Sequence, residues 1–409
     1  MPKTRTGSNI VQVKNHNRQA ILQSLLQAPM SRVERANKLA ISSMTATNLV
    51  RELTDDGLIT AVAPPDTAKS VGRPRTTLQI KADAGYTIGI QMGIGIYWIT
   101  LVDLHGRVIR KDEHRFDIQQ DATAVLATIT EQIQAFKQQV IDSCCPILGI
   151  GFGASGLVNK ETGVNLYAPS LGWHNVPIKA QLEEATDLPV FVENNVRAMA
   201  LAEAYFGAGK TADSLAFVFG RIGVGAGIVL NGRLWRGPQD GAGEIGHTII
   251  IPYGGDQCSC GQTGCLETLV TQPILIKQVQ ELDQASISID YTQSDHQIYE
   301  AILNHARAGH AEINQLIQTM ARYLGLAIAN LINTLNPEII FLGGMYAQGA
   351  DLFVPLVQET VKQRAFGRLG EHANIQATSF GLEAGQVGAS CAALVQFFYK
   401  QYDEKVITS

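Results

Sequence analysis

One histidine and three cysteines in the middle of the chain form the pattern with the clearest chemical meaning. Cys258, Cys260 and Cys265 lie within eight residues, and His247 precedes them after the segment Gly243–Gly246. Three thiolates and one imidazole complete the tetrahedral set of a structural zinc site, and soft thiolates favour zinc over magnesium or calcium. Because protein fills all four positions, none is left for an activated water. The sequence predicts a zinc ion that holds a loop, against the alternative of free cysteines.

A second group of side chains, in the first eighty residues, has the types that read DNA bases. Apolar residues at helical spacing, Ala46, Leu49, Val50 and Leu53, predict a helix from about Ser43. The other faces of this helix carry small polar side chains, an amide and an arginine, which suit entry into a major groove. We therefore expect DNA contacts from Ser42, Ser43, Thr45, Thr47, Asn48 and Arg51.

Two further helices are predicted before this one. Apolar residues from Ile21 to Leu26 recur at helical spacing, and we expect their helix to begin after a cap at Asn15–Asn17. Ser31–Glu34 has the form of a capping box, so a short second helix should follow it. That helix would include Arg32, which we also expect to contact DNA.

The segment after the third helix predicts a wing. Ile59 begins an extended stretch, and Thr76–Ile80 alternates like a strand after a proline-rich loop. Arg73 and Arg75 stand near the tip, where they could clamp phosphate or enter the minor groove. Residues 1–82 are therefore predicted to form a winged helix-turn-helix domain.

The charge distribution supports the same interpretation. Residues 1–80 carry 11 Lys and Arg against 5 Asp and Glu, although the whole chain has a net charge of −5. A basic head on an acidic body favours a polyanionic partner. The alternative is a small helical interaction domain whose polar face is merely solvated.

From Tyr86 onward the pattern changes to alternating strands and helices. Helices are expected near residues 122–143 and 311–334, and strands near residues 86–90, 96–103, 147–153, 188–192, 214–220, 225–231 and 338–342. Strands bounded by glycine turns and alternating with helices indicate an α/β fold, and the length suggests two lobes with a cleft. We expect a first lobe over residues 83–195, a second over 196–383, and a helix near 384–403 that returns to the first.

Several motifs together resemble the ROK family of bacterial repressors, open reading frames and sugar kinases. They are the His/Cys cluster through Cys265-Leu266-Glu267 and the segments Glu193–Asn195, Glu244–His247 and Leu335–Gly344. The resemblance covers nearly the whole chain, including a winged helix of the kind found in the repressor branch. It implies a two-lobed actin-like or ribonuclease-H-like ATPase fold, as in sugar kinases.

The resemblance also implies a sugar site. In the family's kinases the sugar hydroxyls are held by a Glu-Asn-Asp motif, by Glu-Ile-Gly-His and by the Glu of Cys-Leu-Glu. The matching positions here are Asn194, Asn195, Glu244, His247 and Glu267. By the same resemblance, His247 would bind zinc through one ring nitrogen and sugar through the other.

Departures from the kinase pattern favour a sensor over an enzyme. Asn195 stands where the family's kinases have the Asp that accepts the hydroxyl proton, and an amide cannot serve as that base. Gln91 and Gly95 replace the Asp and Thr of the first phosphate loop, and Ile222 replaces the Thr of the second. We therefore expect no catalytic residue.

These observations predict a sugar-responsive repressor of carbohydrate-utilisation genes. It would act as a homodimer or dimer of dimers on a palindromic operator, with a monosaccharide such as xylose or glucose as effector. No apolar run reaches the length of a membrane span, so we expect no membrane insertion and a cytoplasmic, nucleoid-associated protein. The alternatives are an active sugar kinase with a DNA-binding head, or a repressor controlled by a sugar-transporter subunit, as in some members of the repressor branch.

Overall fold

The computed structural model describes residues 5–27, 30–31, 41–62, 77–140, 146–282 and 287–399, in two compact units. The first unit runs to Ala198 and takes up the chain again from Gln386, and the second is continuous from Met199 to Gly385. The division falls three residues beyond the one expected after Asn195. The N-terminal elements belong to the first unit.

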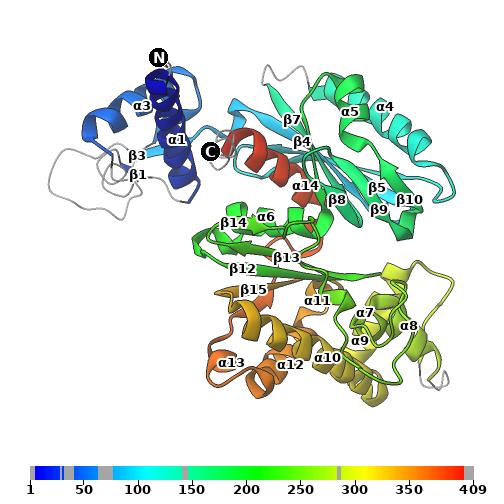
Figure 1. Cartoon of the computed structure of the whole chain (residues 1–409). Coiled ribbons are helices and arrows are strands. Elements are labelled where there is room, and N and C mark those ends of the chain that lie inside the picture. Colours follow the sequence, from blue (N-terminus) through cyan, green and yellow to red (C-terminus); the bar gives the residue numbers. More distant parts are fainter. Residues whose placement is uncertain are drawn as a thin grey trace. The chain divides into compact units, whose positions relative to one another are not determined.

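Among the described residues, two helices and a three-stranded antiparallel sheet open the first unit (Figure 1). The helices are α1 (Arg5–Gln27) and α3 (Ser43–Asp55). Strand β3 (Thr77–Ile80) lies between β1 (Met30–Ser31) and β2 (Ile59–Val62). The predicted second helix, with Arg32, and the wing tip, with Arg73 and Arg75, lie outside the described residues.

The start of α1 differs from the prediction. Asn15–Asn17 lies inside the helix rather than at its cap, because α1 begins at Arg5. An N-cap preference is worth only about 1 kcal/mol. The helix continues N-terminal to the predicted cap, where Lys14 Nζ pairs with Glu52 Oε2 of α3 at 2.9 Å. Contacts with the rest of the fold, rather than local capping, set the extent of such a helix.

The first unit contains a five-stranded sheet in the order β11-β7-β4-β5-β6. Strands β4, β7 and β11 are parallel, and β5 and β6 are antiparallel to their neighbours. Their bounds are Tyr86–Met92 (β4), Ile96–Asp103 (β5), Val108–Arg115 (β6), Ile147–Ala154 (β7) and Val190–Asn194 (β11). A small antiparallel sheet accompanies it, formed by β8 (Leu157–Asn159), β9 (Val164–Ala168) and β10 (Trp173–Val176).

The two faces of β4 and β7 differ because successive side chains alternate. One set, which includes Ile88 and Phe152, packs in a core with α4 (Ala122–Val140) and α5 (Ile178–Thr186). The other face is lined largely by glycine and meets α14 (Ala384–Leu394). A Cβ at Gly89 would lie 2.1 Å from Ser390 Oγ, so this close helix–sheet contact requires glycine.

The last described residues, up to Tyr399, contact both the N-terminal elements and the sheet of the first unit. A π-helix, η7 (Val395–Tyr399), follows α14. The Tyr399 hydroxyl donates to the Leu104 carbonyl at 2.7 Å, and Gln23 of α1 donates to the Tyr399 carbonyl at 3.0 Å. Tyr399, late in the sequence, thus links helix α1 to the residue that follows strand β5.

The second unit repeats the strand pattern of the first. Its sheet has the order β14-β13-β12-β15-β16, with β12, β15 and β16 parallel and β13 and β14 antiparallel. In each sheet, the strand that comes first in the chain (β4 or β12) occupies the third position. The next two strands of the chain lie on one side of it and pair antiparallel with their neighbours, and two strands parallel to it lie on the other side. The bounds are Leu215–Gly220 (β12), Val224–Leu230 (β13), Arg233–Trp235 (β14), Ile339–Gly344 (β15) and Ile375–Ala377 (β16).

Helices pack on this second sheet around a core that centres on α10. The expected strands of both units are confirmed to within two residues at each end, and the expected helix near 311–334 is α10. The described helices of the second unit are α7 (Glu267–Val270), α8 (Gln272–Gln280), α9 (Asp295–Arg307), α10 (Ala311–Leu335), α11 (Met345–Gln348), α12 (Ala350–Arg364) and α13 (Leu369–His372). A further helix, α6 (Asn195–Phe206), begins in the first unit and continues into the second.

Candidate functional site

A loop of the second unit brings the predicted metal ligands together. His247 ends the short 3-10 helix Ile245–His247, and the three cysteines follow in the turn-rich segment before α7. The four donor atoms, from His247, Cys258, Cys260 and Cys265, all lie within 4.8 Å of one another. Such a cluster could hold a metal ion.

The spacing of the donors fits a tetrahedral metal. Zn–S bonds of about 2.3 Å and Zn–N bonds of about 2.0 Å place tetrahedral ligands about 3.8 Å apart for two sulfurs and about 3.5 Å apart for sulfur and nitrogen. The Sγ atoms of Cys260 and Cys265 are 3.7 Å apart. Cys258 Sγ lies 3.6 Å from His247 Nδ1. Two of the six donor pairs thus already have the required separation.

The thiols of this cluster differ in their acidity. A hydrogen bond from the Gln262 backbone lowers the pKa of Cys260. Burial raises the pKa of Cys265 to about 12. A metal needs the thiolate form of each ligand, and a divalent cation favours deprotonation of a coordinating thiol. A bound ion would therefore offset the burial of Cys265.

Glu267 connects this loop to strand β13 in the sheet of the second unit. It is the first residue of α7 and lies two positions after Cys265. Its Oε2 accepts a hydrogen bond from the Val224 backbone at 3.0 Å, and its Oε1 accepts one from Ser259 Oγ at 3.4 Å. The carboxylate thus has a fixed position next to the metal ligands.

Three of the predicted sugar ligands lie in this second unit. Glu244 is exposed and precedes the short helix that carries His247, and Glu267 is half-buried. Because His247 Nδ1 faces Cys258, its Nε2 points to the opposite side of the ring from the cluster. These three residues therefore share one loop region with the metal ligands.

The other two predicted sugar ligands lie in the first unit, where β11 ends and α6 begins. Asn194 Oδ1 accepts from the backbone of Val196 at 3.0 Å, and Asn194 Nδ2 donates to the Gly156 carbonyl at 2.9 Å. Asn195 Oδ1 also accepts from Val196 N, at 2.8 Å. The Asn194 side chain therefore caps α6 while keeping a second amide hydrogen for another acceptor.

Two of the positions that depart from the kinase pattern, Gln91 and Ile222, lack the groups expected there. Gln91 in β4 is buried, and among the described residues its Oε1 has no hydrogen-bond partner. Ile222 is 44% exposed in the turn that joins β12 to β13. A carboxamide and an aliphatic side chain replace the groups that would organise magnesium or donate to phosphate oxygens.

The predicted DNA-reading helix is present as α3, with its two faces as expected. Ala46, Leu49, Val50 and Leu53 are at most 3% exposed. Ser42 caps the helix by accepting from Thr45 N at 3.1 Å. The polar residues on the other faces are exposed or half-exposed: Ser43, Thr45, Thr47, Asn48 and Arg51.

The same helix has one exposed residue that the sequence reasoning missed. Met44 is 78% exposed, in the first turn of α3. Its position could have been found from the helical periodicity, because Met44 is four residues before Asn48 and seven before Arg51. The expected DNA contacts were all polar side chains, whereas Met44 is apolar.

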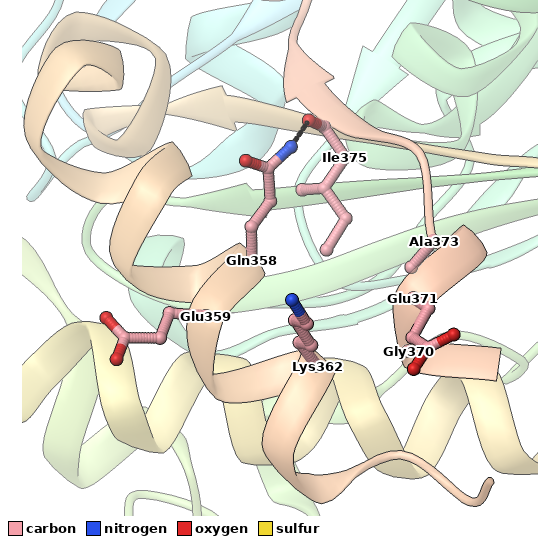
Figure 2. A pocket seen from close by; sticks show the side chains of 7 residues that line it. All are labelled: Gln358, Glu359, Lys362, Gly370, Glu371, Ala373 and Ile375. Atoms are coloured by element: carbon pink, nitrogen blue, oxygen red, sulfur yellow. Dashed lines mark hydrogen bonds between the residues drawn. The ribbon is translucent and has the colours of Figure 1, made fainter. Parts of the chain in front are cut away.

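The described residues also line an open pocket elsewhere in the second unit (Figure 2). Its volume is about 430 Å³, and its lining comes from α12, α13 and β16. Lys362 stands there among the carboxylates of Glu359 and Glu371 and the amide of Gln358, whose Nε2 donates to the Ile375 carbonyl at 2.9 Å. None of the predicted sugar, metal or DNA ligands lines it.

In the part of the chain that is described, no helix is both long and apolar enough to cross a bilayer.

Comparisons with known proteins agree with this architecture. A xylose repressor of Caldicellulosiruptor bescii is 31% identical over 388 residues, which are 94% of this chain and 96% of that protein. A glucokinase of Halalkalibacterium halodurans is 32% identical over 305 residues, which are 74% of this chain and 92% of that protein. The crystal structure of a ROK family transcriptional regulator, a homologue of the Escherichia coli Mlc protein, matches with a TM-score of 0.81 and 30% identity over 96% of this chain and 98% of that one. The model of the ROK family matches residues 87–396, and the chain therefore belongs to the ROK family.

Proposed function

We propose that this protein is a sugar-responsive transcriptional repressor of carbohydrate-utilisation genes. The observation that carries the proposal is the extent of the match to a xylose repressor, which covers 94% of this chain, whereas the match to a glucokinase covers 74%. The ROK family match itself begins at residue 87, after the N-terminal elements. A kinase-like body with an added basic head is the organisation that a DNA-binding sensor requires.

The N-terminal elements act as a winged helix-turn-helix domain in this proposal. Helix α3 enters the major groove with its exposed polar face, and the head carries 11 basic against 5 acidic residues in its first eighty. Arg32, Arg73 and Arg75 add contacts to phosphate or to the minor groove. Two copies in a homodimer, or in a dimer of dimers, bind the half-sites of a palindromic operator.

The His/Cys cluster holds a structural zinc ion in this proposal. Three sulfurs and one nitrogen within 4.8 Å of one another, two pairs of them at tetrahedral spacing, suit zinc, and four protein ligands leave no open position. The ion's chemistry is therefore to fix a loop. By holding the imidazole of His247 and the loop that leads to Glu267, it would orient two sugar ligands.

The effector is a monosaccharide bound by Asn194, Asn195, Glu244, His247 and Glu267. Carboxylates accept from sugar hydroxyls, and amides both donate and accept, so this set suits vicinal hydroxyl groups. Sugar binding shifts the equilibrium between conformations that differ in their affinity for operator DNA. The protein would act in the cytoplasm, at the nucleoid.

A second candidate is an active sugar kinase with a DNA-binding head. The 32% identity to a glucokinase is the observation that favours it. Against it stand Asn195 in place of a base, Gln91 in place of an acidic residue and Ile222 in place of a hydroxyl. An assay of ATP-dependent phosphorylation over a panel of hexoses and pentoses separates the two, because turnover of any sugar would contradict the proposal.

The direct test combines operator selection with effector screening. Purified protein is used to select DNA from a random pool, and binding to the selected sequence is measured with and without each sugar. We expect an enriched palindrome and one sugar that changes its dissociation constant at least tenfold. If DNA is selected but no sugar acts, a pull-down from sugar-grown cells tests the remaining alternative, control by a transporter subunit. If no DNA is selected, the repressor function is wrong.

A further inference from the structure

One exposed methionine stands out among the methionines whose side chains the structure describes. Met92, Met199, Met320 and Met345 are at most 2% exposed, whereas Met44 is 78% exposed. A methionine with that exposure contributes little to packing within the fold. Its long, polarisable side chain is available to an apolar surface of a partner.

The position of Met44 on α3 is central to the outward face. At about 100° per residue, Met44 lies nearly opposite the middle of the buried stripe formed by Ala46, Leu49, Val50 and Leu53. Its neighbours one turn on are Thr47 and Asn48, and Arg51 lies two turns on, all of them exposed. The methionine is thus surrounded by polar side chains, at the N-terminal end of the helix. Residues at that end of a recognition helix contact base edges.

The chemistry of this face selects DNA over a protein surface as its partner. A protein contact built around Met44 would gather further apolar side chains, but Ser43, Thr47, Asn48 and Arg51 are polar. The head is basic, with 11 Lys and Arg against 5 Asp and Glu in its first eighty residues. In a major groove, the apolar group offered by the base pairs is the 5-methyl of thymine.

We propose that Met44 reads a thymine in each operator half-site by packing its side chain against the 5-methyl group. This inference rests on the proposed DNA-binding function and assigns a specificity-determining residue within it. The contact is apolar, so it adds no hydrogen bond and no phosphate contact. Loss of this contact should make operator affinity independent of the thymine methyl group, while the salt dependence of DNA binding changes little.

Deoxyuridine provides the matched probe, because it lacks only that methyl. The operator is first selected with the wild-type protein, and each thymine of a half-site is then replaced in turn by deoxyuridine. Burial of one methyl group corresponds to about a fourfold change in affinity. We expect one position per half-site to weaken wild-type binding about fourfold, and about fifteenfold when both half-sites are changed.

Variants of Met44 complete the test. Met44→Ala should bind the thymine operator about as weakly as the wild type binds the deoxyuridine operator, and it should no longer distinguish the two. Met44→Leu retains apolar surface and should keep most of the discrimination. Alanine is favourable in an exposed helical position, so a thermal melt should show that the head of the alanine variant remains folded.

The outcomes separate this inference from the proposed function. Wild-type binding to a selected operator, with no thymine sensitive to deoxyuridine, overturns the role of Met44 and leaves the repressor function standing. Loss of affinity in Met44→Ala that is equal for both operators also overturns it, as does a change in oligomeric state with DNA binding unaltered. Failure of the wild-type protein to select any DNA overturns both proposals.

Discussion

Replacing Cys260 by serine tests the metal proposal with little disturbance of packing. Cys260 is the exposed member of the cluster, whereas Cys265 is fully buried. The substitution therefore removes one thiolate without opening a cavity in the core. Thr263→Ser, at an exposed neighbour in the same loop, serves as the matched control.

The expected magnitude comes from the loop that the ion closes. Cross-linking a segment as long as His247–Cys265 restricts the unfolded chain by about 3 kcal/mol in the entropic model of cross-links. A domain the size of the second unit loses about 2–4 °C in Tm for each kcal/mol. Loss of the metal should thus lower the Tm of this unit by about 6–12 °C.

Metal content and calorimetry measure the two parts of this prediction. The wild-type protein and Thr263→Ser should carry one zinc per chain by elemental analysis. Cys260→Ser should carry much less and should melt at a lower temperature, as should the wild-type protein after chelation. The sugar response should weaken with it, because His247 and Glu267 lose their anchor. Wild-type protein that contains no zinc, and whose Tm a chelator leaves unchanged, would refute this reasoning.

Three further predictions concern packing and the sugar site. Gly151→Ala would place a Cβ 1.9 Å from the Ala389 carbonyl oxygen, so denaturant titration should show the free energy of unfolding lowered by about 3 kcal/mol. Gly241→Ala is the control, because its Cβ would meet nothing closer than 3.9 Å. It should change the free energy of unfolding by less than about 0.5 kcal/mol. Asn195→Asp restores a carboxylate but not the phosphate loops, so a coupled assay should detect no ATP-dependent turnover; turnover by this single variant would mean that nucleotide binding is intact. Glu267→Gln keeps the shape but not the charge, and calorimetric titration should show an effector Kd raised about tenfold at unchanged zinc content; unaltered sugar affinity would exclude a contact from this carboxylate.

Local patterns in the sequence predicted local features of the structure well. The buried face of α3 follows from helical periodicity, because residues three and four apart share one side. The His/Cys cluster was also predictable, since Cys258, Cys260 and Cys265 are close in sequence and their chemistry is distinctive. By contrast, capping signals at Asn15–Asn17 gave the wrong start for α1, because the helix continues beyond them to Arg5, with Lys14 paired to Glu52 of α3. A local capping preference of about 1 kcal/mol is too weak to fix the end of a helix.

Features that depend on residues far apart in sequence could not be predicted in this way. The individual strands could be predicted from local patterns in the sequence. The order of the strands, which is equivalent in the two five-stranded sheets, depends on pairing between distant segments that no local pattern encodes. The bond between Glu267 and the Val224 backbone joins residues 43 apart. Gly151 had no evident role until the structure placed Ala389 against it.

The return of α14 to the first unit has a consequence for biosynthesis. Residues 199–385 form a continuous unit, whereas the glycine-lined face of β4 and β7 is covered by Ala389 and Ser390, more than two hundred residues later. A ribosome adding about 5–20 residues per second leaves that face bare for on the order of tens of seconds. The later-encoded unit can therefore finish folding before the earlier-encoded one, and the first unit closes only once nearly all of the chain has been made.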